Sequence, residues 1–280
     1  MMQNRTMMDL KSSILTFSLA GGLLAFMPES KKAETQEIEP IRKLNQTAFK
    51  KGEFLRYDVS YGYFSAATAT LKIAGVSKKM NGRNTFHIIG KGQSAGALNW
   101  FFKVEDRYET YIDEEAILPW KFIRHVREGD YELDRDIRFN QYMNTATVTQ
   151  NGDKDYHVEP NTQDLLSAFY YARTLDMQDA EIGQEFIINT FFDREIYPLK
   201  FKFLGPEIVK TALGSFNCLK FRPMVEKGRV FKEEEDMTLW VSDDANKVPI
   251  SVKSELLVGS IEMDLVEYKN LVRPLNKVID

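Results

Sequence analysis

The sequence predicts a mainly β fold, in the form of a large curved antiparallel sheet or open barrel with one principal helix. Short segments in which apolar and polar residues alternate follow one another along most of the chain, at a spacing of about 10 residues. Turn-forming pairs such as Asn81-Gly82 and Lys227-Gly228 stand between them. About 13 or 14 strands of this kind rarely form a flat sheet, which indicates a curved or barrel-like one.

In the first half of the chain, the segment 131–139 shows the alternation most clearly. Leu133 and Ile137 share one face, while Glu132 and Asp134 share the other. This pattern is typical of a strand with one solvated face, and it accounts for the acidic residues without a metal cluster. The strands predicted in this half are residues 54–63, 67–76, 85–90, 104–112, 120–126, 131–139 and 145–150.

One helix interrupts the strands, at about residues 162–175. Leu165 and Phe169 belong to an apolar stripe at helical spacing, and Asn161 with Asp164 resembles an N-cap followed by an acidic residue three positions later. We expect this apolar stripe to lie on the sheet. The strands predicted after the helix are residues 185–192, 197–204, 207–211, 214–222, 236–242, 250–257 and 259–268.

The N-terminal residues have the order of a secretory signal. Arg5 and Lys11 precede an uncharged apolar run at 14–27, and the polar residues PESKKAE follow it abruptly. The run has 14 residues, fewer than the about 20 that cross a bilayer, so we expect a removed signal and no retained membrane span. The predicted organisation is a signal peptide at 1–27, a charged lead-in at 28–51, a single β-rich domain at 52–270 and a tail at 271–280.

The composition and the motifs contain no recognisable reactive apparatus. The chain has 37 Lys and Arg against 41 Asp and Glu, for a formal net charge of -4, which gives no indication of nucleic-acid binding. No two of its three histidines lie at metal-ligand spacing, Cys218 is its one cysteine, and no phosphate-binding loop, dinucleotide motif or nucleophile elbow is present. The sequence therefore predicts no cofactor, no metal ligands and no catalytic residues, and it favours a non-enzymatic protein.

A curved sheet capped by a helix encloses an apolar space, and such spaces bind ligands through apolar walls and a few polar groups. Aromatic and arginine residues near the predicted strand ends and on the helix are the candidates for ligand binding. They are Trp100, Phe101, Arg107, Arg124, Tyr170 and Arg173. A core of this size also needs large aromatic side chains, so packing in the core remains the alternative explanation for them.

Five segments of the chain carry a resemblance to a known family. They are GEFLRYDVSYG at 52–62, VEDRYETYID at 104–113, LPWKFIRHVREGDYE at 118–132, DLLSAFYYARTLDM at 164–177 and LWVSDDANKVPISV at 239–252. Together they resemble the exported bacterial family catalogued as domain of unknown function 3108. The resemblance implies export to the periplasm of a Gram-negative bacterium, and it supplies no reaction and no catalytic residues. The ending, in which an acidic turn separates Trp240 from Pro249, is also similar in style to periplasmic lipoprotein carriers of the LolA/LolB type.

The leading hypothesis is a periplasmic, non-enzymatic binding protein with an apolar cavity for a hydrophobic small molecule or a lipid. Two alternatives stay open. The first is an interaction module whose partner is another protein of the cell envelope. The second is a hydrolase that acts on an envelope polymer, against which the lack of an activated nucleophile counts.

Overall fold

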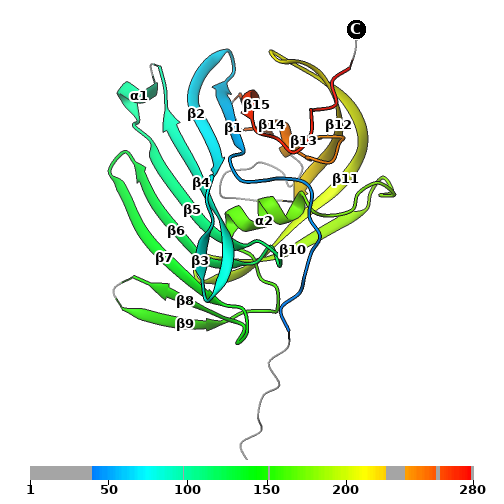
Figure 1. Cartoon of the computed structure of the whole chain (residues 1–280). Helices are drawn as coiled ribbons and strands as arrows, with labels where there is room; N and C mark the ends of the chain where they lie inside the picture. Colours follow the sequence, from blue (N-terminus) through cyan, green and yellow to red (C-terminus); the bar gives the residue numbers. More distant parts are fainter. Residues whose placement is uncertain (1–39, 97, 151, 225–236, 257–258, 279–280) are drawn as a thin grey trace, which may run out of the picture. The chain divides into compact units, whose positions relative to one another are not determined.

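In the computed structural model, a single antiparallel sheet of 15 strands dominates the residues that the structure describes (Figure 1). The structure describes residues 40–96, 98–150, 152–224, 237–256 and 259–278, all within the compact unit Ile38–Asp280. The strands are β1 (Phe54–Tyr61), β2 (Phe64–Ile73), β3 (Lys78–Met80), β4 (Arg83–Ser94), β5 (Glu105–Asp113), β6 (Pro119–Glu128), β7 (Tyr131–Asn140), β8 (Thr145–Thr149), β9 (Asp153–His157), β10 (Glu185–Phe192), β11 (Glu195–Thr211), β12 (Gly214–Met224), β13 (Met237–Ser242), β14 (Pro249–Glu255) and β15 (Ser260–Lys269). The helices are α1 (Leu98–Phe101) and α2 (Leu165–Ala172).

The strands of the sheet are hydrogen-bonded in a meandering order. Neighbours follow one another as β10-β11-β12-β13-β14-β15-β1-β2-β4-β5-β6-β7-β8-β9, and β3 pairs with β4. In the described residues no pairing joins β9 to β10, so the sheet is curved but not closed. The predicted fold class is confirmed. The predicted signal peptide at 1–27 lies outside the described residues, and within them no helix has the length and apolar character to cross a bilayer.

The strand boundaries differ from the predicted ones at a few places. The predicted strands 197–204 and 207–211 form the single strand β11, whose register shifts between Phe203 and Gly205. Gly205 has a φ of 106°, which glycine adopts without strain, so the strand bends there without ending. The short elements β3, β9 and α1 were not predicted, because sequences such as KKM and DKDYH carry no apolar alternation.

Helix α2 is shorter than the predicted 162–175, and a different residue caps it. The Asp164 carboxylate accepts a hydrogen bond from the Ser167 backbone N–H at 2.8 Å, and the Asp164 N–H donates to the Ser167 hydroxyl at 2.8 Å. Asn161 instead takes a left-handed conformation in the preceding turn, with a φ of 63°. The helix lies within the curve of the sheet and contacts both β5 and β10 (Figure 1).

Packed residues extend beyond the predicted domain 52–270 at both ends. Phe49 of the predicted lead-in is buried and packs edge-on against Phe86 and Tyr170, with ring centroids 5.4 and 4.9 Å apart. Leu275 of the predicted tail is buried in a second apolar cluster. A few apolar residues between charged ones are enough to anchor a segment, and the overall polarity of the segment does not reveal them.

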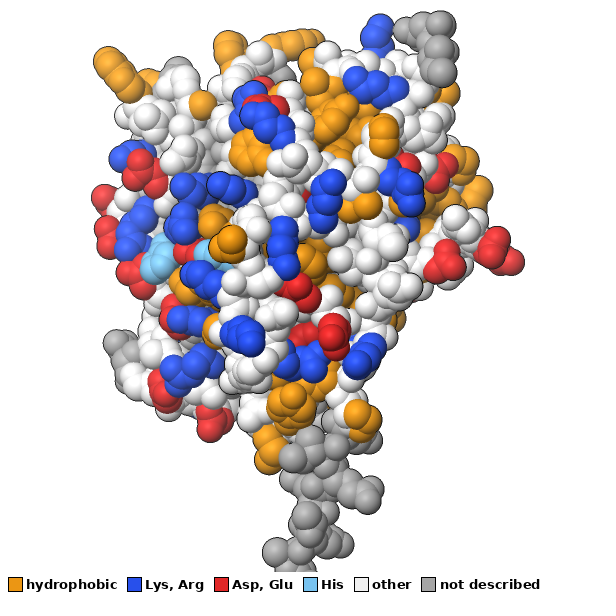
Figure 2. All heavy atoms as spheres, viewed as in Figure 1, with side chains coloured by type: hydrophobic (Ala, Val, Ile, Leu, Met, Phe, Trp, Pro, Cys, Tyr) orange, Lys and Arg blue, Asp and Glu red, His pale blue; other side chains and the backbone are white. Residues whose placement is uncertain are grey.

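The outer face of β4 to β7 is rich in charged side chains (Figure 2). Lys121 pairs with Asp136 at 2.7 Å. Hydrogen bonds from Arg127 and His125 to Asp134 lower the pKa of this carboxyl to about 2. The solvated face predicted for 131–139 is therefore confirmed.

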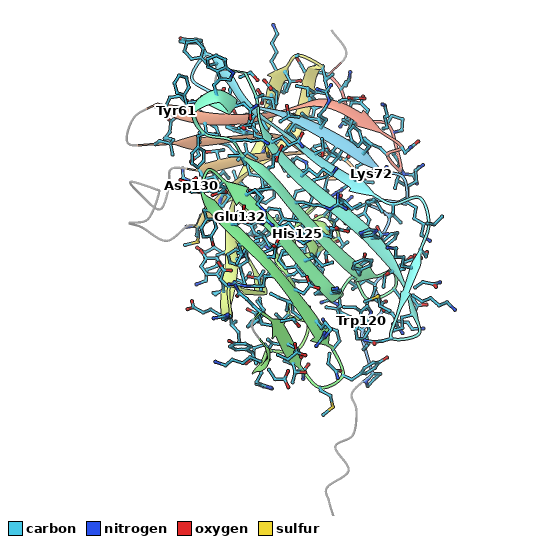
Figure 3. All side chains as sticks on the ribbon, turned by 90° about the vertical axis from the view of Figure 1, so that its left-hand side faces the viewer. Tyr61, Lys72, Trp120, His125, Asp130 and Glu132 are labelled. Carbon is cyan, nitrogen blue, oxygen red and sulfur yellow. The ribbon has the colours of Figure 1, made fainter. Side chains whose placement is uncertain are left out.

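The turns at the two ends of the strands form two rims, at opposite edges of the sheet. We name the first the α1 rim; it consists of residues 61–64, 98–104 and 128–131. We name the second the Trp120 rim; it consists of residues 114–120 and 243–248. Figure 3 shows Tyr61 and Asp130 at one edge of the sheet and Trp120 at the other.

Candidate functional site

A cavity of about 640 Å³ lies between α2 and the inner face of the sheet. Its walls come from α2 and from strands on both halves of the sheet, including β2, β4, β11, β13 and β15. Most of the lining side chains are apolar, among them Leu71, Leu166, Phe169, Phe201, Leu239 and Met263. Ligand sites for small molecules commonly have volumes of roughly 300–1,000 Å³ and walls of this kind.

One face of α2 supplies a wall of the cavity. Leu165, Leu166, Phe169 and Ala172 line it, and their spacing places them along one stripe of the helix. Tyr170 lies on another side of the same helix and is buried in the core. The apolar stripe predicted for the helix thus borders the cavity.

Small residues on the sheet determine how closely other side chains pack around this space. Ala69, Gly90 and Gly92 all belong to the lining. A Cβ atom added at Gly90 would lie 3.3 Å from the Leu71 side chain and 3.5 Å from that of Leu166. The absence of a side chain at Gly90 therefore lets both leucines approach the strand backbone.

A buried ion pair borders the cavity. Arg173, which follows α2 and belongs to the lining, donates to both carboxylate oxygens of Glu53 at 2.6 and 2.9 Å. It also donates to the carbonyl oxygens of Ala48 at 3.0 Å and Asn246 at 2.9 Å. Burial by itself lowers the pKa of Arg173, but Glu53 outweighs it and raises the pKa, so the guanidinium stays charged.

Tyr57 also belongs to the lining, next to this ion pair. Its hydroxyl is fully buried and has no hydrogen-bond partner among the described residues. Burial raises the pKa of Tyr57, so the hydroxyl stays protonated. The side chain of Tyr57 is therefore part of the wall, while its hydroxyl is turned away from the open space.

The described residues contain no assembled metal site. No group of three or more His, Cys, Asp and Glu side chains is placed there to hold a metal ion. His87 Nε2 lies 2.5 Å from Glu109, and its ring stacks on Tyr111 at 4.4 Å. Cys218 is buried, and burial raises its pKa to about 12, so it stays a thiol.

The chain matches a known family over the strands that surround this cavity. The family model described as "Protein of unknown function (DUF3108)" matches residues 56–266. The chain belongs to this family. The matched range spans the cavity from Tyr57 in β1 to Met263 in β15. The resemblance seen in the sequence is thereby confirmed, and no curated relative matches the chain.

Three solved structures are among those to which this chain is similar. A β-barrel-like protein of the domain of unknown function DUF1849 from Brucella abortus is 10% identical, with a TM-score of 0.51, and the match covers 79% of this chain and 99% of that one. A "putative lipoprotein" from Parabacteroides distasonis is 11% identical over 81% of this chain and 100% of that one, with a TM-score of 0.36. A "putative exported protein with YmcC-like fold" from Bacteroides fragilis is 10% identical over 80% and 100%, with a TM-score of 0.29. The Brucella structure shows that the DUF3108 chain shares a barrel-like fold.

Of the six candidate ligand-binding residues, Arg173 belongs to the lining of the cavity. Tyr170 does not, because it points into the core and packs against Phe49. Trp100 and Phe101 lie in α1 outside the lining, with 92% and 85% of their surface exposed. The sequence places these two residues near the end of a strand, but it does not show on which side of the sheet they project.

Arg107 and Arg124 also lie outside the lining. Arg107 stands between Asp106 and Tyr108, which do line the cavity, and its Nε donates to Glu109 at 2.8 Å. Because neighbouring side chains on a strand point to opposite faces, Arg107 is directed away from the cavity. Arg124 Nη1 instead donates to Asp193 at 2.5 Å.

The sequence reasoning missed most of the apolar wall. Leu71, Leu239, Val252 and Met263 line the cavity, and each lies on a strand that was predicted. The alternation of apolar residues identifies the inward face of a strand. It carries no signal that separates a side chain in the packed core from one at the surface of an internal space.

Proposed function

We propose that the protein binds a lipid-like or other hydrophobic ligand in the cavity between α2 and the sheet, without catalysing a reaction. The observation that carries this proposal is the apolar cavity of about 640 Å³. Water in such a space leaves apolar side chains hydrated, and a hydrophobic ligand that replaces it removes that surface from water. The site of action that we propose is the periplasm of a Gram-negative bacterium, in line with the signal-like order of residues 1–27.

Filling the cavity tests this proposal. Ala69→Phe and Ala172→Phe each place a ring at a lining position, and Thr68→Phe is the matched control at the neighbouring position outside the lining. We expect the two lining variants to bind a fluorescent fatty-acid probe at least about tenfold more weakly than the wild type. The control should bind it normally. Native mass spectrometry of the purified protein should show a hydrophobic adduct that the lining variants lack.

Two results would contradict the proposal. One is probe binding that is unchanged in both lining variants while thermal unfolding shows that they are folded. The other is a wild-type protein that carries no adduct and binds no apolar probe.

A further inference from the structure

The α1 rim carries a group of exposed aromatic side chains. Three neighbouring loops supply them: the β1–β2 turn, the α1 loop and the β6–β7 turn. The exposed rings are Tyr63, Phe64, Trp100, Phe101, Phe102 and Tyr131. Figure 2 shows apolar side chains that stand out above α1 and above the β1–β2 turn. Exposed apolar groups gathered in one place mark an interaction surface, whereas isolated ones are common on any protein.

Hydrogen bonds fasten the three loops to one another. The Ala95 backbone N–H donates to the Ala66 carbonyl at 2.8 Å, which ties the α1 loop to β2. The Gly129 N–H donates to the Lys103 carbonyl at 2.9 Å, which ties the β6–β7 turn to the α1 loop. The Phe102 ring lies against Gly129, where an added Cβ would be 3.0 Å from it. The three loops that carry the exposed rings are therefore held together at the α1 rim.

The same rim is continuous with the cavity. Asp106 and Met237 are the second residue of β5 and the first of β13, and Pro223 is the last but one of β12. All three line the cavity. The strand pairings place these three strand ends on the side of the sheet that bears the α1 rim. A ligand that enters or leaves at these strand ends passes close to the exposed rings.

The charges at the α1 rim indicate which kind of partner it can bind. The β1–β2 turn has no charged residue, and in the α1 loop Lys103 pairs with Glu105 at 2.9 Å. The β6–β7 turn adds the acidic residues Glu128 and Asp130. A surface that is apolar, aromatic and slightly acidic does not suit a polyanion or an anionic membrane, but it is compatible with zwitterionic head groups.

We propose that the α1 rim docks on the surface of a zwitterionic phospholipid bilayer, with Trp100, Phe101 and Phe64 inserted at the level of the head groups. Tryptophan and tyrosine are favoured at that depth because each combines an apolar ring with a polar group. The inference extends the proposed function, and it rests on it in one respect: a protein that binds a lipid-like ligand meets that ligand at a membrane.

Binding to vesicles of phosphatidylcholine and phosphatidylethanolamine tests the docking surface. We expect the wild type to float with the vesicles, and the double variant Trp100→Ser/Phe101→Ser to lose at least about tenfold in partition coefficient. Both side chains are exposed, so the variant should keep its fold. Val76→Ser and Ile208→Ser, which remove exposed apolar side chains elsewhere, should bind as the wild type does.

Fluorescence gives a second readout of the same binding. The chain has three tryptophans, of which Trp120 is buried and Trp240 half-buried. Vesicles should therefore shift the emission of Trp100 to shorter wavelength, and brominated lipids should quench it. Addition of salt should leave the partition coefficient unchanged.

Three outcomes would overturn the docking surface. The first is a wild type that does not bind vesicles, and the second is a double variant that binds them as well as the controls do. The third is a wild type that sediments as a dimer while the double variant sediments as a monomer, which would make a second copy of the chain the partner. The cavity is tested separately, because Ala69→Phe should weaken probe binding and leave vesicle binding intact. A protein that binds the probe but no vesicles would refute the docking surface and leave the proposed function standing.

Discussion

The tryptophans at the two rims of the sheet differ in how much of their surface is exposed. Trp120 is 2% exposed, and its indole N–H donates to the Asp113 carboxylate at 3.1 Å. Trp100 is 92% exposed. Both residues lie near strand ends in stretches rich in aromatic residues, so local sequence alone does not account for the difference.

The difference comes from what covers each rim. At the Trp120 rim, the Leu44 N–H donates to the Glu115 carbonyl at 2.7 Å, and Arg42 donates to the Ala116 carbonyl at 2.9 Å. Asp113 accepts from Trp120, from the Ala116 N–H and from Arg83. Burial alone raises the pKa of Asp113, but these hydrogen bonds lower it below its ordinary value. In the described part of the chain, the rings of the α1 rim have no comparable cover.

The largest expected effect concerns the buried ion pair between Glu53, which precedes β1, and Arg173, which follows α2. Through its other hydrogen bonds, Arg173 also holds Ala48 and the β13–β14 turn. We expect Glu53→Ala to lower the free energy of unfolding by about 3–5 kcal/mol, because it leaves the Arg173 guanidinium buried without its counterion. Denaturation in urea measures the loss. Glu267→Ala, which breaks the half-exposed pair with Arg56, is the control and should cost far less.

Replacing both members of the buried pair sharpens this test. Glu53→Leu/Arg173→Met removes both charges at once, and it should be more stable than Glu53→Ala alone. A loss in Glu53→Ala no larger than that in Glu267→Ala would show that the Trp120 rim is held closed by other contacts.

Removing the covered tryptophan should have the next largest effect. We expect Trp120→Ala to lower the free energy of unfolding by about 3–4 kcal/mol, because it leaves a cavity and an unpaired acceptor on Asp113. Trp120→Phe keeps most of the ring and should lose less. If Trp120→Ala unfolded at the same urea concentration as the wild type, the burial of this rim would not contribute to stability.

The N-cap residue of α2 should make the free energy of unfolding depend on pH. Asp164 is fully buried, and burial raises its pKa from 3.8 to about 6 against the opposing hydrogen bonds from Thr110 and Ser167. The folded protein therefore holds this proton more tightly than the unfolded chain does. Stability due to Asp164 is present below pH 3.8 and is lost as the pH rises through about 6.

Asp164→Asn isolates this contribution, since asparagine also caps helices but does not titrate. The stability of the wild type relative to the variant should fall by roughly 2–3 kcal/mol between about pH 4 and pH 7. Unfolding curves of both proteins at several pH values measure the difference. A flat difference curve, or one that rises with pH, would contradict the raised pKa.

The smallest effect belongs to the exposed tryptophan. We expect Trp100→Ala to change the free energy of unfolding by no more than about 0.5 kcal/mol, because its side chain is almost fully solvated. The same urea experiment measures it. A loss comparable to that of Trp120→Ala would show that the α1 rim is covered in solution and would remove the contrast between the rims.

Much of the fold could be predicted from the sequence, because a strand with one solvated face repeats every two residues. Leu133 and Ile137 face inward as predicted, and the outward Asp134 is solvated. The helix was predicted three residues too long at each end, since Asn161 and Asp164 are both good N-cap residues and tertiary contacts select Asp164. Thr110 of β5 donates to its carboxylate at 2.5 Å, a contact that local sequence does not contain.

The candidate site was predicted less well. Arg173 was identified, but the sequence could not show that Glu53 neutralises it from 120 positions away. It also could not show that Tyr170 turns into the core while Phe169, its neighbour on α2, lines the cavity.

The sequence by itself determined that the chain forms antiparallel strands around an apolar interior with one amphipathic helix, because these features depend on short periodic patterns. The tertiary structure decided where that interior is filled and where it stays open. Packing between distant segments determines that, since Phe49 packs against Phe86 and Tyr170 on one side while the small residues Ala69 and Gly92 leave space beneath α2.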